Sequence, residues 1–334
     1  MLTTLAVIGL AFSLDLLVGE PPTPIHPVAW FGRLVDGLDR AWSTDDRRQR
    51  LAGLVIAALC PLVPAAVAAG AVLAAAELHP IGGGIVAAFL LFLTTSLRSL
   101  LELTEDVVAA TDGSLERARK DVRGLVGRDA STLSAGELRS GAVESAAENL
   151  ADGLVATLLA FAVLAPVSLP AAGAIAAWIK AVNTLDSMLG YPSKPIGTAS
   201  AHLDDLVMYL PARIAAAAIA IAAGDPLALV RARQWARVPP SPNSGWPMAT
   251  LACALSVRLE KPDVYVLNPG GELPTLADGQ RAVTVVGRAA VVSIVLAVVL
   301  ATVVSEFGRD LEAYWQVLAT LNTEHATGVR PKWP

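Results

Sequence analysis

SGAVESAAENLAD (residues 140–152) leads into the charge-free stretch LVATLLAFAVLA. Within it, Glu144, Glu148 and Asp152 follow one another at intervals of four residues, and Asn149 stands beside the second acid. At about 100° of rotation per residue, this spacing places the three carboxylates on one stripe of a helix, where like charges repel. The three carboxylates therefore need a cation, a bound ligand or water to offset their mutual repulsion. A solvated helix face just before the chain enters a membrane is the alternative interpretation.

A second polar cluster follows the next apolar run. Asn183 and Asp186 lie in AVNTLDSMLGY, and Asp204 and Asp205 lie in HLDDLVMYLP. Acidic residues inside or at the edge of a membrane are costly and usually functional. Two such clusters flanking one hydrophobic segment predict that they form the walls of a single site.

The composition is that of a membrane protein. Of 334 residues, 54% are hydrophobic and 16% are charged, and the mean hydropathy is +0.56. A soluble domain usually carries about 25% charged residues, so this chain is expected to cross a membrane several times. With 25 basic and 30 acidic residues, no nucleic-acid partner is expected.

The sequence predicts an all-α integral membrane protein. We expect a polytopic helical bundle with broken or re-entrant elements and two large polar cytoplasmic loop regions, in a single membrane domain over residues 1–305. The candidate spans, judged by apolar length, are 2–17, 52–76, 82–97, 154–179, 206–223 and 283–304. The polar parts are the regions 98–150 and 224–281 and the C-terminal tail 306–334.

Basic residues give a partial topology. They are concentrated in residues 33–50, 117–139 and 231–281, which the positive-inside rule places in the cytoplasm. A simple alternation of six spans then leaves Asn183 to Asp205 outside, away from Glu144. The conflict disappears if residues 154–179, which contain Pro166 and Pro170, form a re-entrant hairpin, or if 206–223 is not a true span. We expect a broken or re-entrant element here.

Several stretches combine helix-breaking residues with polar side chains in a chain that otherwise avoids polarity. They are DLLVGEPPTPIHPVAWFGRL, LVGRDAST, AVESAAENLADG, AVNTLDSMLGY, LDDLVMYLPAR and PSPNSGWPMA. In this order and spacing they resemble the CobD/CbiB family of cobalamin-biosynthesis membrane proteins, the adenosylcobinamide-phosphate synthases. The resemblance covers essentially the whole chain, up to about residue 305.

The resemblance implies formation of an amide bond between a propionate carboxylate of adenosylcobyric acid and aminopropanol or its phosphate. ATP as co-substrate and Mg²⁺ are expected with it. It also implies a multi-pass protein in the cell membrane, with its active site on the cytoplasmic side. The lipid bilayer and other membrane-bound cobalamin-assembly enzymes are the further expected partners.

The candidate residues follow from that chemistry. Mg²⁺ bound to phosphate prefers hard carboxylate ligands, for which the candidates are Glu148, Asp152, Asp204 and Asp205. Phosphoryl transfer needs cations, for which the candidates are Arg33, Arg128 and Arg213, with His26 as a further donor.

The attacking amine needs a base, and desolvation beside two carboxylates favours Glu144 for this role. Glu148, Asp152 and Asp186 complete the predicted catalytic set. The expected substrate-binding residues also include Asn149, Asn183, Ser241, Asn243 and Ser244. The chain has no GxxxxGK[ST] motif, so nucleotide binding must be non-standard.

Other interpretations remain open at this point. His26 is also typical of a residue that caps a loop, and SPNSG of an ordinary turn. The acids also fit an ion-coupled transporter, although no paired interrupted segments are found in two halves of the chain. A non-catalytic AmpE-like membrane sensor is the third interpretation, and the many candidate Mg²⁺ ligands argue against it.

Overall fold

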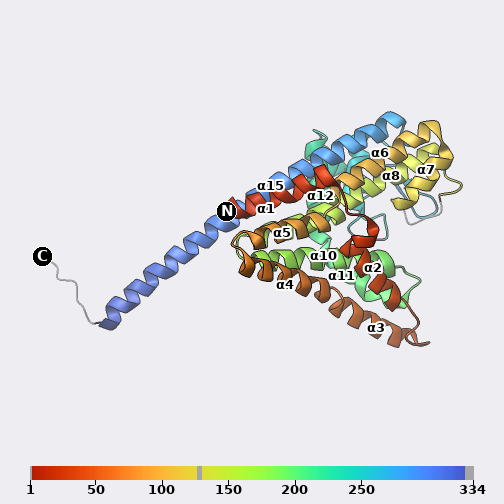
Figure 1. Cartoon of the computed structure of the whole chain (residues 1–334). Helices are drawn as coiled ribbons and strands as arrows, with labels where there is room; N and C mark the ends of the chain where they lie inside the picture. The colour runs from red at the N-terminus through yellow and green to blue at the C-terminus, as the bar shows by residue number, and fades with distance from the viewer. Residues whose placement is uncertain (1, 126–129, 328–334) are drawn as a thin grey trace.

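We analysed a computed structural model, which describes residues 2–125 and 130–327. Helices make up most of it (Figure 1). The α-helices are α1 (Leu2–Val18), α2 (Pro27–Leu38), α3 (Asp46–Leu59), α4 (Leu62–Leu78), α5 (Gly82–Thr94), α6 (Leu97–Gly113), α7 (Leu115–Asp121), α8 (Ala135–Leu150), α9 (Ala156–Leu164), α10 (Leu169–Leu189), α11 (Thr198–Val207), α12 (Tyr209–Ala222), α13 (Leu227–Ala232), α14 (Gly245–Leu255) and α15 (Leu276–Thr327). Short helical turns are η1 (Thr23–Ile25), η2 (Val122–Gly124), the π-helix η3 (Ala151–Val155) and η4 (Pro195–Gly197).

The expected all-α polytopic fold is confirmed in its class. In the described chain, four helices are long and apolar enough to cross a membrane: Asp46–Leu78, Gly82–Gly113, Ala135–Leu164 and Leu276–Asp310. A fifth span results if Pro195–Val207 and Tyr209–Ala222, which are bent by 49° relative to each other, are counted together. The predicted span 206–223 overlaps that bent pair. The predicted span 2–17 corresponds to α1, a shorter apolar helix.

The structure divides residues 154–179 between α9 and α10, so this segment is not one straight span, in agreement with the broken or re-entrant element expected there. Residues 154–164 continue the helix that begins at Ala135, so the acids of α8 lie within a candidate span and not in a loop before it. The chain then turns at Ala165–Ser168, and α10 packs back against α9 as an αα-hairpin. Ser168 caps α10 by accepting from the Ala171 N–H, and Pro170 occupies its first turn.

The αα-hairpin of α9 and α10 explains how the two polar clusters meet. Asp152 and Lys180 are equally far along the chain from Pro166, in the turn. In an antiparallel pair of helices, residues equidistant from the turn lie at the same height. Asn183 and Asp186 therefore return to the level of the α8 acids and are not carried to the other side of the membrane.

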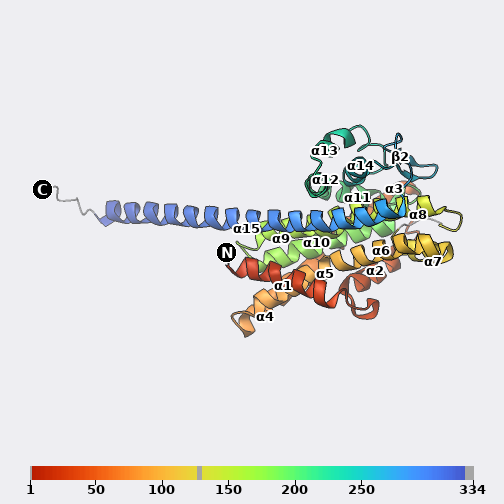
Figure 2. The same cartoon turned by 90° about the horizontal axis from the view of Figure 1, so that it is seen from above.

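The polar regions gather towards one end of the bundle. In Figure 2, α7, the start of α8 and strand β2 lie at the end opposite the projecting C-terminal part of α15. The second polar region contains a feature that the sequence analysis missed, an antiparallel hairpin of β1 (Leu259–Lys261) and β2 (Tyr265–Leu267). β1 packs on α8, which places the hairpin beside the acids.

Asp15 joins α1 to the start of α6. Its side chain is fully buried, and its Oδ2 accepts a hydrogen bond from the Arg98 N–H at 3.0 Å. The residue that precedes α6, Ser96, makes no side-chain cap. Asp15 therefore supplies the N-cap of α6 from another helix, where a carboxylate also meets the positive end of the helix dipole.

We expect Asp15→Ala to reduce the free energy of unfolding by about 1–3 kcal/mol, because it leaves an N–H group of α6 without an acceptor. The measurement is thermal unfolding of the purified protein in detergent. Asp36→Ala is the matched control, since Asp36 is exposed on α2 and no hydrogen bond of its side chain is found among the described residues. Equal unfolding temperatures for the two variants would contradict a capping role for Asp15.

Candidate functional site

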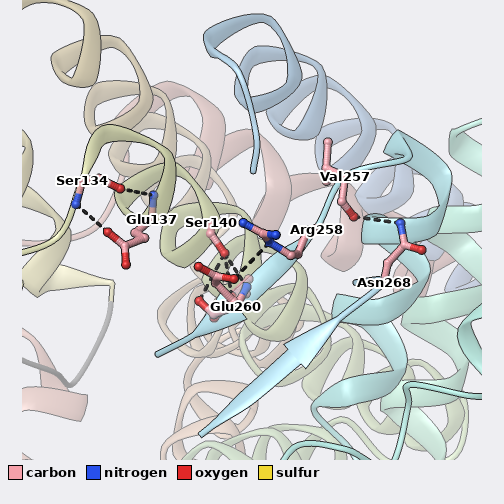
Figure 3. Close-up of polar contacts among 8 residues, drawn as sticks. Ser134, Glu137, Ser140, Val257, Arg258, Glu260 and Asn268 are labelled. Carbon is pink, nitrogen blue, oxygen red and sulfur yellow. Dashed lines mark hydrogen bonds and ion pairs between the residues drawn. The ribbon is translucent and has the colours of Figure 1, made fainter. Parts of the chain in front are cut away.

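The acidic row lies on one continuous helical segment. Ser134 and Glu137 form a capping box that begins α8 (Figure 3). Glu144 and Glu148 lie on α8, and Asp152 lies in the π-helix η3. The π turn departs from the regular α geometry that the spacing argument assumed, and such turns are frequent at functional sites. Asp152 nevertheless acts electrostatically on Glu148.

The β-hairpin holds Glu144. Ser140 Oγ donates to Glu144 Oε1 at 2.8 Å, and the Tyr265 hydroxyl donates to Glu144 Oε2 at 3.0 Å. Ser140 also accepts from the Glu260 N–H at 2.7 Å, as Figure 3 shows. Glu144 is buried, so its carboxylate is anchored between α8 and both strands.

The second polar cluster faces the first. Asp152 interacts electrostatically with Asp186 and Asp204, and Glu148 interacts with Asp186. Asp205 lies close enough to act on both Asp186 and Asp204. We call Glu144, Glu148, Asp152, Asp186, Asp204 and Asp205 the acidic centre. The single pocket predicted from the two clusters thus corresponds to one group of interacting side chains.

The acidic centre has an excess of negative charge. Asp204 is buried, and its Oδ1 has no hydrogen-bond partner among the residues that the structure describes, although Asn183 contacts the same carboxylate. Buried carboxylates of like charge are costly unless a proton or a cation offsets them. In the described chain, no three Asp, Glu, His or Cys side chains form a preformed metal site. A cation here would therefore need further ligands from a bound molecule.

Cationic side chains approach the centre from two directions. Lys180 on α10 interacts with Asp152 and with Glu20 of the N-terminal loop, and Lys261 on β1 interacts with Glu148. Neither lysine was among the predicted site residues. Lys180 directly follows residues 154–179, which were predicted to be a span, and it was not assigned to the site. Lys180 lies three residues before Asn183, and this spacing was the signal that the two side chains share one face of the helix.

His26 lies beside Lys180 and Glu20. Its Nδ1 accepts from the Val28 N–H at 3.2 Å and caps α2, as one of the two interpretations proposed. Burial lowers the pKa of His26 from its usual value, Lys180 lowers it further, and Glu20 opposes the shift. The imidazole is therefore neutral at pH 7, and with Nδ1 used as an acceptor, its proton is on Nε2.

The loop that contains Ser241 and Asn243 closes another side of the centre. Ser241 Oγ donates to Asp205 Oδ1 at 3.2 Å, and Asn243 Nδ2 donates to the Asp205 carbonyl at 2.7 Å. Arg213, a candidate cation for phosphoryl transfer, makes no ion pair with Asp204 or Asp205 among the described residues. It instead donates to Asn243 Oδ1 and lies over the Tyr209 ring, 3.8 Å from its centroid. The arginine thus stabilises the loop that orients Asp205.

Three of the other predicted residues, Arg33, Asn149 and Ser244, lie outside this group. Arg33 is exposed on α2, and Arg128 is outside the described residues. Asn149 donates to Ser145 and lines a separate cavity of about 150 Å³ that also contains Glu20. Ser244 precedes α14 without capping it through its side chain.

A bundle of apolar helices around a buried acidic centre defines a polytopic membrane protein with a polar site inside its helical region. The chain belongs to the CobD/CbiB family of cobalamin biosynthesis, because the family model described as "CobD/Cbib protein" matches residues 8–298. The predicted resemblance is thereby confirmed.

Individual relatives agree with this assignment. The chain is 34% identical over 309 residues to the "Probable cobalamin biosynthesis protein CobD" of Methanothrix thermoacetophila, covering 88% of this chain and 96% of the relative. It is 38% identical over 285 residues to the "Cobalamin biosynthesis protein CobD" of Geobacter metallireducens, covering 82% and 86%. It is 34% identical to the "Cobalamin biosynthesis protein CbiB" of Salmonella paratyphi B, covering 83% and 88%. No solved structure matches the chain.

Proposed function

We propose that the protein joins adenosylcobyric acid to aminopropanol or its phosphate in an ATP-dependent reaction that forms an amide bond. Membership of a cobalamin-biosynthesis family supports this proposal. The observation that carries it is the acidic centre, in which carboxylates from α8, η3, α10 and α11 interact beside two lysines, Lys180 and Lys261. Such a centre suits a reaction in which phosphates, a divalent cation and an amine meet.

The chemistry has two steps. A carboxylate is a poor acyl donor, so its oxygen first attacks a phosphorus of ATP, giving an acyl phosphate and ADP or an acyl adenylate and pyrophosphate. The amine nitrogen then attacks the activated carbon, a C–N bond forms, the phosphate or AMP leaves, and the nitrogen loses a proton to a base. Both steps proceed best where bulk water is excluded.

Mg²⁺ fits the donor set. Asp204 offers a buried oxygen that no described residue contacts by a hydrogen bond, and Glu148, Asp152 and Asp205 offer further hard oxygen ligands. Mg²⁺ usually takes only one or two carboxylates from a protein and completes its shell with phosphate oxygens and water, which agrees with the lack of a preformed three-residue site among the described residues. When bound, the ion would neutralise charge on the phosphates of ATP.

The base is better assigned to Glu148 than to Glu144, which was the sequence-based prediction. Both oxygens of Glu144 already accept hydrogen bonds, from Ser140 and Tyr265. In the described chain, no hydrogen bond engages the Glu148 carboxylate, and it lies between Glu144 and Asp186. Glu148 is therefore freer to take a proton from the amine.

The test uses the purified full-length protein in detergent with adenosylcobyric acid, aminopropanol phosphate, ATP and MgCl₂. We expect a corrinoid amide and one equivalent of ADP, or of AMP and pyrophosphate, per amide formed. Reactions without amine and without Mg²⁺ are the controls. Neither amide nor nucleotide turnover from well-folded protein would refute the proposal, and transport of a corrinoid without ATP turnover would favour the transporter interpretation.

A further inference from the structure

A cavity of about 250 Å³ lies between α2 and the helices α4, α5 and α10. Its walls are mostly apolar and include Trp30, Phe31, Val67 and Leu90. Lys180 is the one charged residue among the described residues that line it. Lys180 therefore links this apolar cavity to the acidic centre, because it also interacts with Asp152.

Among the described residues, Lys180 has no direct counter-ion. In the part of the chain that the structure describes, no ion pair within 4.0 Å includes it, although Glu20 and Asp152 act on it from farther away. A largely buried ammonium without a contacting anion is costly. A ligand that brings its own anion would remove that cost.

The size of the cavity limits what it holds. Since a water molecule occupies about 30 Å³ of liquid, the space corresponds to roughly eight waters, and sites that enclose a whole drug-sized ligand are typically about 300–1,000 Å³. A corrinoid macrocycle is too large for it. One side arm with neighbouring methyl groups fits, and a propionate arm ends in an anion.

We propose that this cavity binds the edge of the corrinoid that carries the reacting propionate, and that Lys180 binds its carboxylate. The inference rests on the proposed function and assigns the substrate carboxylate to a position between Lys180 and Asp152. The apolar walls select for an uncharged ring edge, and the ammonium selects for an acid over an amide. The amine and ATP then approach from the side of the acidic centre.

The test compares two corrinoids without ATP or amine, so that it reports binding alone. Adenosylcobyric acid has the free carboxylate, whereas adenosylcobinamide carries an amide at that arm. By equilibrium dialysis with the full-length protein in nanodiscs, we expect the acid to bind at least about tenfold more tightly, as is usual for a hydrogen bond between charged groups. Lys180→Gln should abolish this preference, and Lys180→Arg should retain part of it.

Two further variants separate the effect of the cavity and its lysine from that of a lysine elsewhere. Ala177→Leu, which narrows the cavity, should weaken both corrinoids and keep the preference, whereas Lys120→Gln, at an exposed lysine of α7, should change neither. A folded Lys180→Gln protein with the wild-type preference would overturn the inference, as would a folded Lys180→Arg protein with none. If the wild type shows a Lys180-dependent preference but forms no amide, the proposed reaction fails and the binding site stands.

Discussion

Glu148→Gln and Asp152→Asn are each expected to reduce the rate of amide formation at least ~10³-fold while leaving the protein folded in the membrane. Removal of a general base typically costs 10²–10⁴-fold, and loss of a metal ligand adds to this. Both side chains are held in the acidic centre by a helix that is continuous from Ala135 to Leu164. Neither substitution changes the shape of the side chain, so binding of the corrinoid to the Lys180 cavity should persist.

The stability of these variants is as informative as their activity. Glu148 and Asp152 repel each other and repel Asp186, so replacing either with a neutral isostere removes unfavourable charge. We expect unfolding temperatures equal to or above that of the wild type, as is common when a functional site has been built at a cost in stability. Thermal unfolding and turnover should be measured on the same preparations.

Matched controls are available on α6. Glu105→Gln and Asp106→Asn make the same changes at exposed positions and should leave both activity and stability unchanged. If Glu148→Gln and Asp152→Asn both showed near-normal turnover, the acidic row would be a structural or solvated feature. Lower unfolding temperatures in both would mean that the two carboxylates stabilise the fold.

Much of this arrangement could be predicted from local patterns. The capping box at Ser134, the turn near Pro166 and the meeting of Glu148 with Asp186 follow from spacing, capping and proline positions. These are rules about neighbours along the chain. The cofactor and substrate assignments stay predictions, because they derive from the family and not from the residues alone.

What the sequence analysis missed depends on long-range packing. Charged residues were treated as the ends of spans, yet Glu148 and Lys180 lie inside continuous helices, where the backbone is satisfied and the side chains face the protein interior. The hydrogen bond from Arg213 to Asn243 joins residues that are 30 positions apart in the sequence, which no local pattern predicts. The hairpin at Leu259–Leu267 has strands of three residues each, too short for a clear alternating pattern.

The second large effect is expected at Glu144, which the β-hairpin anchors. Glu144→Ala is expected to lower the free energy of unfolding by about 2–4 kcal/mol, because it removes the hydrogen bonds that Ser140 and Tyr265 donate to this buried carboxylate and leaves Ser140 with the longer bond to the Glu260 carbonyl. Tyr265→Phe should cost less, about 1–2 kcal/mol. In a double-mutant cycle, the two losses should add to more than the loss in the combined variant, because both remove the same hydrogen bond.

Glu144→Gln separates anchoring from catalysis. The amide oxygen of glutamine still accepts from Tyr265, so we expect a folded protein whose turnover falls by less than about tenfold, because the proton of the amine goes to Glu148. The pH dependence of turnover should keep its wild-type form for the same reason. A folded but inactive Glu144→Gln protein would return the role of base to Glu144, and Tyr265 would then be the residue that orients it, since its hydroxyl contacts the carboxylate directly.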